Sequence, residues 1–291
     1  MAAITHVPVL LNEVIEGLDP KRGGIYVDGT VGLGGHAEAV LSRILPGGIL
    51  IGIDKDGEAL SIARDRLGGY GKAAYLIKGD FYRMAEIVRN TGFAEVDGIL
   101  LDLGVSSLQL FSEDRGFSFR SSAPLDMRMD KAQDLTAWDV VNKYPEGRLE
   151  EIIRAYGEER YARRIVRAVV RNRPIDTCLQ LSALIDGLGI RSGRIHPATR
   201  TFQALRIEVN MELDNLSSCM SEGVGILKKG GRFCVISYHS LEDRVVKNSF
   251  RDTAKQGIMK LITKKPLRPT REELGINPSS RSARLRVAER M

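Results

Sequence analysis

Two aspartates and a run of glycines near the N-terminus could bind a nucleoside cofactor. Asp28 and Asp54 each end a short apolar segment, and Gly32, Gly34 and Gly35 lie between them. Glycine has no Cβ, so a ligand can approach the backbone closely there. An acid that ends the second segment can accept hydrogen bonds from both hydroxyls of a ribose. The spacing therefore predicts a cofactor loop followed by a ribose-binding acid.

Two classes of cofactor fit this spacing. The pattern Gly32-x-Gly34-x-x-Ala37 loosely matches the dinucleotide fingerprint, in which the loop and helix N-terminus hold a pyrophosphate. Asp28 would face that dianion, whereas an acid suits the ammonium of S-adenosylmethionine. A tight turn that needs glycine for positive φ is the purely structural alternative. We favour the methyl donor.

Asp102 and His239 are the candidates for catalysis. Asp102 follows an apolar segment at residues 96–101, and many enzymes that methylate amines place an acid and two prolines there. Such an acid orients the amine for in-line attack on the methyl group. The proline pair is absent here, so Asp102 could contact the amine or the cofactor, or only cap a turn. His239 follows the fifth predicted strand, and a structural histidine is its alternative.

These residues require a parallel sheet to bring them to one edge. Short apolar segments predict strands at residues 25–28, 48–54, 73–77, 96–104 and 230–238. Helical patterns alternate with them, which predicts a doubly wound α/β fold. The segments at 259–263 and 282–289 could form a last antiparallel pair.

The alternation stops between residues 112 and 215. Helices are predicted there at residues 137–142, 149–156, 159–172, 178–188 and 199–216. We therefore predict a methyltransferase domain made of residues 1–112 and 216–291. Residues 113–215 would form an all-helical insertion that recognises RNA.

Positive charge is concentrated in two places. Residues 216–291 contain 16 Lys and Arg against 7 Asp and Glu, and the whole chain has a net charge of +6. Within the insertion, five arginines share one helix face: Arg160, Arg163, Arg164, Arg167 and Arg171. Both features predict an anionic partner such as RNA, although a solvated basic tail and a solvated helix face are the alternatives.

Composition excludes several other classes. The three cysteines, Cys178, Cys219 and Cys234, are an odd number without a close pair, which favours a reducing cytoplasm. No segment is typical of a signal peptide or a membrane span, so we expect a cytoplasmic protein without a membrane partner. The four histidines are too scattered to predict a metal site.

Eight longer motifs identify a family. They are His6-x-Pro8-Val9-Leu10-Leu11-x-Glu13, Asp28-Gly29-Thr30-x-Gly32-x-Gly34-Gly35-His36, Asp102-Leu103-Gly104-Val105-Ser106-Ser107-x-Gln109-Leu110, Arg115-Gly116-Phe117-Ser118-Phe119, Pro124-Leu125-Asp126-Met127-Arg128-Met129, Ala198-Thr199-Arg200-Thr201-Phe202-Gln203-Ala204-Leu205-Arg206-Ile207, Ser237-x-His239-Ser240-Leu241-Glu242-Asp243-Arg244 and Arg281-Ser282-Ala283. With these motifs the chain resembles the MraW/RsmH family, the bacterial 16S ribosomal RNA cytosine N(4)-methyltransferases.

The resemblance implies a class I, Rossmann-like fold, S-adenosyl-L-methionine as methyl donor and a decoding-centre (P-site region) cytidine of the small ribosomal subunit as target. Carried over by motif, the cofactor contacts are Gly34, Gly35, His36, Asp54, Phe81, Asp102 and Gln109. We predict RNA contacts for Arg115, Arg128, Arg163, Arg167 and Arg171. Two residues depart from the family pattern: Tyr238 stands where Phe is usual, and Ser279 where Arg is usual.

Two other function classes stay open at this point. A nicotinamide-dependent oxidoreductase would share the glycine loop and Asp54, although Asp28 argues against it. A noncatalytic RNA-binding protein would use only the basic C-terminal part and the arginine face.

Overall fold

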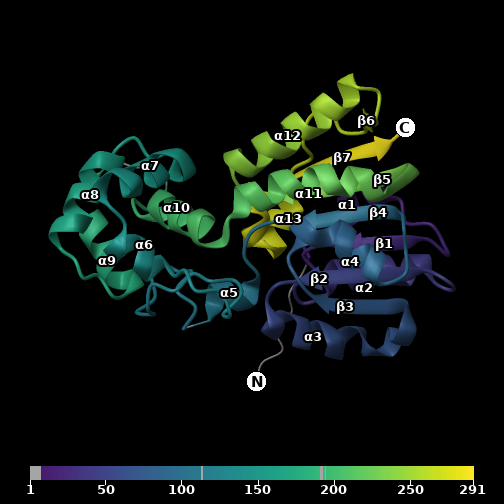
Figure 1. The fold of residues 1–291 in the computed structure, drawn as a ribbon, viewed down its shortest axis with the longest axis horizontal. Coiled ribbons are helices and arrows are strands. Elements are labelled where there is room, and N and C mark those ends of the chain that lie inside the picture. The colour runs from purple at the N-terminus through teal and green to yellow at the C-terminus, as the bar shows by residue number, and fades with distance from the viewer. Residues whose placement is uncertain (1–7, 113, 191–192, 194) are drawn as a thin grey trace. The chain divides into compact units, whose positions relative to one another are not determined.

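The computed structural model describes residues 8–112, 114–190, 193 and 195–291. They form two compact units, Met1–Gly104 with Leu213–Met291, and Val105–Glu212 (Figure 1). The boundaries predicted from the sequence, after residues 112 and 215, lie a short way beyond Gly104 and Glu212. His6 lies outside the described residues. Among the described residues, no helix is long and apolar enough to cross a membrane.

The first unit is built on a seven-stranded mixed sheet. In spatial order its strands are β3 (Ala74–Lys78), β2 (Ile49–Asp54), β1 (Ile25–Asp28), β4 (Val96–Asp102), β5 (Leu227–Ser237), β7 (Arg284–Arg290) and β6 (Met259–Leu261). The first five are parallel, and the last two pair antiparallel, as predicted. The strand order reverses between β1 and β4, which is the switch point of a doubly wound sheet. The predicted class I, Rossmann-like fold is confirmed.

Helices cover both faces of this sheet. One layer contains α1 (Leu11–Leu18), α2 (Gly35–Ile44) and α3 (Gly57–Leu67). The other contains α4 (Met84–Asn90), α11 (Glu212–Ile226) and α12 (Ser240–Lys255). Neighbouring strand residues alternate between the two cores: on β4, Leu100 belongs to the first core and Leu101 to the second. Both faces are therefore buried, which explains the nearly continuous apolar strands.

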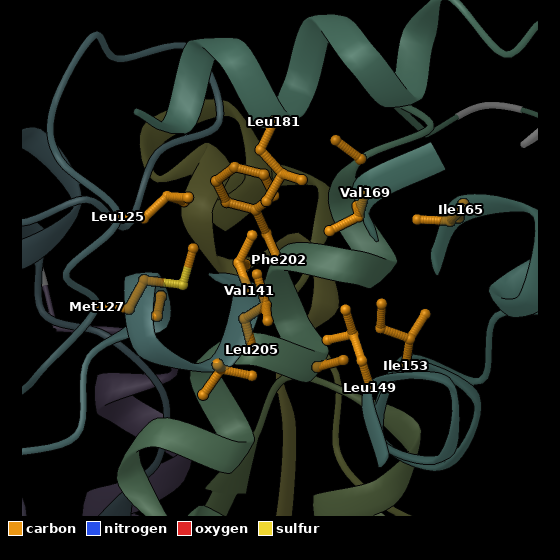
Figure 2. Close-up of a cluster of buried hydrophobic side chains, with 14 of the residues drawn as sticks. Leu125, Met127, Val141, Leu149, Ile153, Ile165, Val169, Leu181, Phe202 and Leu205 are labelled. Carbon is orange, nitrogen blue, oxygen red and sulfur yellow. The ribbon is translucent and has the colours of Figure 1, made fainter. Parts of the chain in front are cut away.

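The regular structure in the described part of the second unit consists of helices and one isolated bridge between Pro124 and Thr177. Its helices are α5 (Ser107–Phe111), α6 (Ala137–Lys143), α7 (Glu146–Gly157), α8 (Ala162–Arg171), α9 (Cys178–Asp186) and α10 (Thr199–Asn210). Figure 2 shows its own core, where Leu125 and Met127 from a loop meet Phe202 and Leu205 from α10. The predicted helices at α6 to α9 are confirmed.

The single helix predicted over residues 199–216 is wrong. Met211 adopts the left-handed conformation with φ 52°, which ends α10 before α11 begins. Asn210, the last residue of α10, is buried and its side chain bonds the backbone of a distant loop. Its Oδ1 accepts from the Met129 amide at 2.9 Å, and its Nδ2 donates to the Met127 carbonyl at 2.8 Å. The helix therefore stops where its end residue is needed to hold that loop.

Asn210→Ala should destabilise the second unit. It would leave a buried amide and a buried carbonyl without these partners, a loss of roughly 1–3 kcal/mol in the free energy of unfolding. Urea unfolding can be followed by the fluorescence of Trp138, the single tryptophan of the chain, on α6. Asn172→Ala is the control, because that exposed side chain donates only to Ala168 of its own helix. Equal midpoints for both variants would contradict the assigned role.

Candidate active site

Three neighbouring parallel strands each end in an aspartate. Asp54 ends β2, Asp28 ends β1 and Asp102 ends β4. The register pairs Asp28 with Gly52 on one side and Leu100 on the other, so all three acids reach the same edge of the sheet. This edge lies at the switch point, where doubly wound sheets bind their ligands. The predicted convergence of these residues is thus present.

Burial makes two of these acids hard to ionise. Desolvation above all, with the negative charges of Asp102 and Asp54, raises the pKa of Asp28 to about 7 against the opposing effects of His36 and the Thr30 amide. Desolvation also raises the pKa of Asp54 to about 6. Such an edge favours a ligand that brings a positive charge.

The glycine loop is braced by Asp54. Its Oδ2 accepts from the Gly32 amide at 2.8 Å and its Oδ1 from the Asp56 amide at 2.8 Å. Gly34 has φ 82° at the start of α2, a conformation that favours glycine. A Cβ on Gly35 would lie 2.6 Å from Cγ of Pro8, so that position also needs glycine. The predicted ribose acid thus also holds the loop that precedes it.

The ring nitrogens of His36, unpaired among the described residues, indicate a ligand-binding site. The side chain is buried, and both ring nitrogens have no hydrogen-bond partner within the described part of the chain. Its Nε2 lies 3.5 Å from Oδ2 of Asp102. Buried polar groups in proteins are nearly always satisfied, so these nitrogens require a partner that the described residues do not supply. Together with the acidic edge, this fits the charged amino-acid end of S-adenosylmethionine.

Phe81 and Gln109 differ in what surrounds them. Phe81 begins a short 3-10 helix, Phe81–Arg83, and flanks the loop after β1: a Cβ on Gly29 would lie 3.2 Å from the Phe81 Cβ. It is half-buried, as an apolar wall for adenine requires. Gln109 belongs to the other unit, where its Oε1 accepts from the Ser106 amide at 3.1 Å in the capping box of α5. Its cofactor contact stays a prediction.

His239 has a structural role, and its catalytic role stays a prediction. It is the N-cap of α12, and its Nδ1 accepts from the Glu242 amide at 3.3 Å. Its Nε2 lies 3.2 Å from Oε1 of Glu242. Its Nδ1 thus caps the helix, whereas its Nε2 is buried and has no hydrogen-bond partner within the described part of the chain.

The structure contradicts the predicted RNA contacts of Arg115 and Arg128. Arg115 is 1% exposed and donates to the carbonyls of Arg128 and Met129 at 3.1 and 2.9 Å. Arg128 forms a two-pronged ion pair with Asp126 and donates to the Gln133 carbonyl at 2.7 Å. Each guanidinium holds a loop of the second unit, so neither is free to pair with a phosphate.

The arginine face of α8, unlike Arg115 and Arg128, is exposed to solvent. Arg163, Arg167 and Arg171 are exposed and line a shallow pocket of about 480 Å³. The other residues of this pocket are Arg160, Tyr161, Arg164, Ala168 and Leu188. Arg164 donates to the Leu188 carbonyl at 2.6 Å, and Arg167 lies 4.0 Å from Glu146. This face therefore presents a dense group of cations to solvent.

Two residues of the site are absent from the predicted set. In the sequence Asp28 serves only as an argument for a cationic ligand, although its place at a strand end is a signal that puts it beside Asp54 and Asp102. Tyr238 donates to Oδ1 of Asp102 at 2.8 Å. Its only signal in the sequence was its departure from the family pattern.

Binding of S-adenosylmethionine should depend on the ionisation of Asp28. The cationic amine prefers the carboxylate, so the dissociation constant should fall roughly five- to tenfold from pH 6 to 7.5 as a group with a pKa near 7 ionises. The gain should end near pH 8, where an amine of this kind loses its own proton. Asp54, with a pKa of about 6, contributes at the acid end. Isothermal titration calorimetry measures this dependence.

Asp28→Asn should bind more weakly at pH 7.5 and with a flatter pH dependence. Asp65→Asn, an exposed aspartate on α3, is the matched control and should behave as the unchanged protein does. If Asp28→Asn kept the full pH dependence, the ammonium would not lie at Asp28.

Comparison with known proteins assigns the chain to a family. Residues 3–291 match the MraW methylase family. The chain is 50% identical to the ribosomal RNA small subunit methyltransferase H of Syntrophus aciditrophicus, with 98% of each chain covered. It is 48% identical to the protein of that name from Geotalea uraniireducens, with 100% of each covered. An rRNA methylase structure from Streptococcus thermophilus is similar at 12% identity and TM-score 0.45, covering 97% of this chain and 93% of that one. The chain therefore belongs to the MraW methylase family, and S-adenosyl-L-methionine is its methyl donor.

Proposed function

We propose that this protein transfers a methyl group from S-adenosyl-L-methionine to the N(4) amine of a cytidine in the decoding centre of 16S rRNA. Full-length relatives that are 46–50% identical carry the name ribosomal RNA small subunit methyltransferase H, which supports the substrate. The observation that carries the chemistry is Asp102 beside Asp28 at the switch-point edge. A ribosomal substrate also agrees with the predicted cytoplasmic location.

The residues at this edge can position a weak nucleophile. The exocyclic amine of cytosine is conjugated with its ring, so it reacts only if its lone pair is aligned with the methyl group. Asp102 can accept a hydrogen bond from that amine, because no donor of the described chain bonds its Oδ2; His36 Nε2 is 3.5 Å away. S-adenosylmethionine supplies an electrophilic methyl group on its sulfonium. As the N–C bond forms and the C–S bond breaks, the amine becomes cationic and loses a proton to water, so no strong base is needed.

The arginine face of α8 is our candidate for RNA binding. Four arginines on α8, with Arg160 just before it, exceed what solubility requires, and no acid lies between Arg160 and Arg173 in the sequence. Exposed guanidinium groups can release counterions from phosphates, which makes affinity depend on salt.

The alternative of a nicotinamide-dependent oxidoreductase is disfavoured, because Asp28 would repel the pyrophosphate of its cofactor.

The position of the methyl group is tested by nucleoside mass spectrometry of 16S rRNA. A strain that lacks the gene should lose N(4)-methylation at one decoding-centre cytidine, and the intact gene should restore it. The Asp102→Asn variant should restore it poorly. Loss of a methyl group from carbon 5 or from a ribose, with N(4) unchanged, would refute the proposal.

Replacement of Arg163, Arg167 and Arg171 with Gln should weaken RNA binding and leave the cofactor affinity unchanged. Loss of about three phosphate contacts should reduce the slope of log affinity against log salt by roughly 2–3. Filter binding of 16S rRNA at several salt concentrations measures this slope.

A charge-matched control separates the arginine face from net charge. Arg83, Arg154 and Arg251 are each paired with an acid of their own helix or turn. Their triple replacement with Gln removes the same charge and should change the slope far less. If both triple variants reduced the salt slope equally, the arginine face would be only a solvated surface without a specific role in RNA binding.

A further inference from the structure

The side chain of Tyr238 reaches the proposed catalytic acid from the neighbouring strand. β5 pairs with β4 in parallel, with Asp102 opposite Ile236. Tyr238 follows the end of β5, and its hydroxyl donates to Oδ1 of Asp102 at 2.8 Å. The contact joins two residues 136 positions apart in the sequence, and only the sheet brings them together.

The backbone of Tyr238 is held in place by the start of α12. Its amide donates to Oε2 of Glu242 at 2.8 Å, and the His239 amide donates to the same oxygen at 3.3 Å. Glu242 is itself buried. Glu242 thus fixes the backbone from which the Tyr238 side chain extends.

The ring and the hydroxyl of Tyr238 are both in fixed surroundings. The ring lies over Gly104, which has φ 100°; a Cβ there would be 3.4 Å from Cδ2 of the ring. Burial and the charge of Asp102 raise the pKa of Tyr238 well above its usual value of 10.0. The hydroxyl is therefore protonated at any pH at which the enzyme works, and it acts as a donor to Asp102.

Two hydrogen bonds hold Asp102, and a third group lies near it. Its amide donates to Oγ1 of Thr30 at 2.6 Å, Tyr238 occupies Oδ1, and His36 Nε2 lies 3.5 Å from Oδ2. We propose that Tyr238 is a positioning residue of the methyl transfer: its hydroxyl fixes the plane of the Asp102 carboxylate and leaves Oδ2 to accept a hydrogen bond from the ligand. This inference rests on the proposed role of Asp102.

A phenylalanine at this position would keep the ring over Gly104 but would not donate to Oδ1. The carboxylate could then rotate about its Cβ–Cγ bond, and the ligand would have to restrict this motion itself. Misalignment of a reacting group lowers the rate without a matching loss of binding, because the reaction needs tighter geometry than binding does.

A double-mutant cycle tests this inference with the full-length protein. The variants are Tyr238→Phe, Asp102→Asn and both together, and the measurements are kcat and KM on unmethylated small subunits and the dissociation constant of S-adenosylmethionine. If Asp102 contacts the amine, Tyr238→Phe should lower kcat by roughly five- to twentyfold with KM within about twofold. If Asp102 contacts the cofactor, a similar factor should appear in the dissociation constant. In either case Tyr238→Phe should have little effect once Asp102 is Asn.

Tyr144→Phe is the matched control. Tyr144 also donates to a carboxylate, Oε1 of Glu208 at 3.1 Å, but in the second unit. It should change neither kcat nor the dissociation constant. Equal effects of Tyr238→Phe with and without Asp102, or no effect on either quantity, would overturn the inference. If the unchanged protein bound the cofactor but did not methylate small subunits, the proposed function would be refuted. The double-mutant cycle could then still be measured through the dissociation constant of S-adenosylmethionine, and it would still test Tyr238.

Discussion

Three carboxylates meet at one edge of the sheet, and the burial of the middle one, Asp28, is the constraint on which the site depends. Asp28 is 2% exposed and has Asp54 and Asp102 on the adjacent strands. Folding raises the pKa of Asp28 from 3.8 to about 7. A carboxyl group of this kind stabilises the folded state at pH values below its unfolded pKa, and this stabilisation is lost as the pH rises through the folded pKa. Near neutral pH, ionisation of Asp28 therefore opposes the ligand-free fold, and a cationic ligand would relieve that cost.

The three acids differ in their hydrogen-bond partners and therefore in their roles. Two backbone amides hold Asp54, which links the glycine loop to the end of β2. Side chains hold Asp102, with Tyr238 on one oxygen and His36 near the other. Among the residues that the structure describes, Asp28 accepts a hydrogen bond only from the Thr30 amide, at 3.1 Å, and the charge of His36 lies nearby. It is therefore the acid that would gain most from a cation.

The arginines of the second unit show how burial separates structure from recognition. A buried guanidinium must find acceptors within the protein, and Arg115 finds them in two carbonyls of its own loop region. On α8 the apolar side, with Ile165, Val166 and Val169, faces the core, so the opposite side keeps its arginines in solvent. Residue type was the same in both places, and only the burial differs.

The sequence by itself determined the sheet, the helices and the strand-end acids, because these follow from local periodicity and from glycine and aspartate at the ends of apolar segments. It also determined the family, through motifs such as the one from Asp28 to His36. It did not predict that α10 ends at Asn210, because the reason is a hydrogen bond to a loop 81 residues away. Only the tertiary structure decided that His239 caps a helix, that Arg115 is buried and that Tyr238 meets Asp102. Those roles depend on which partners are close in space, and the packing of strands and helices sets that proximity.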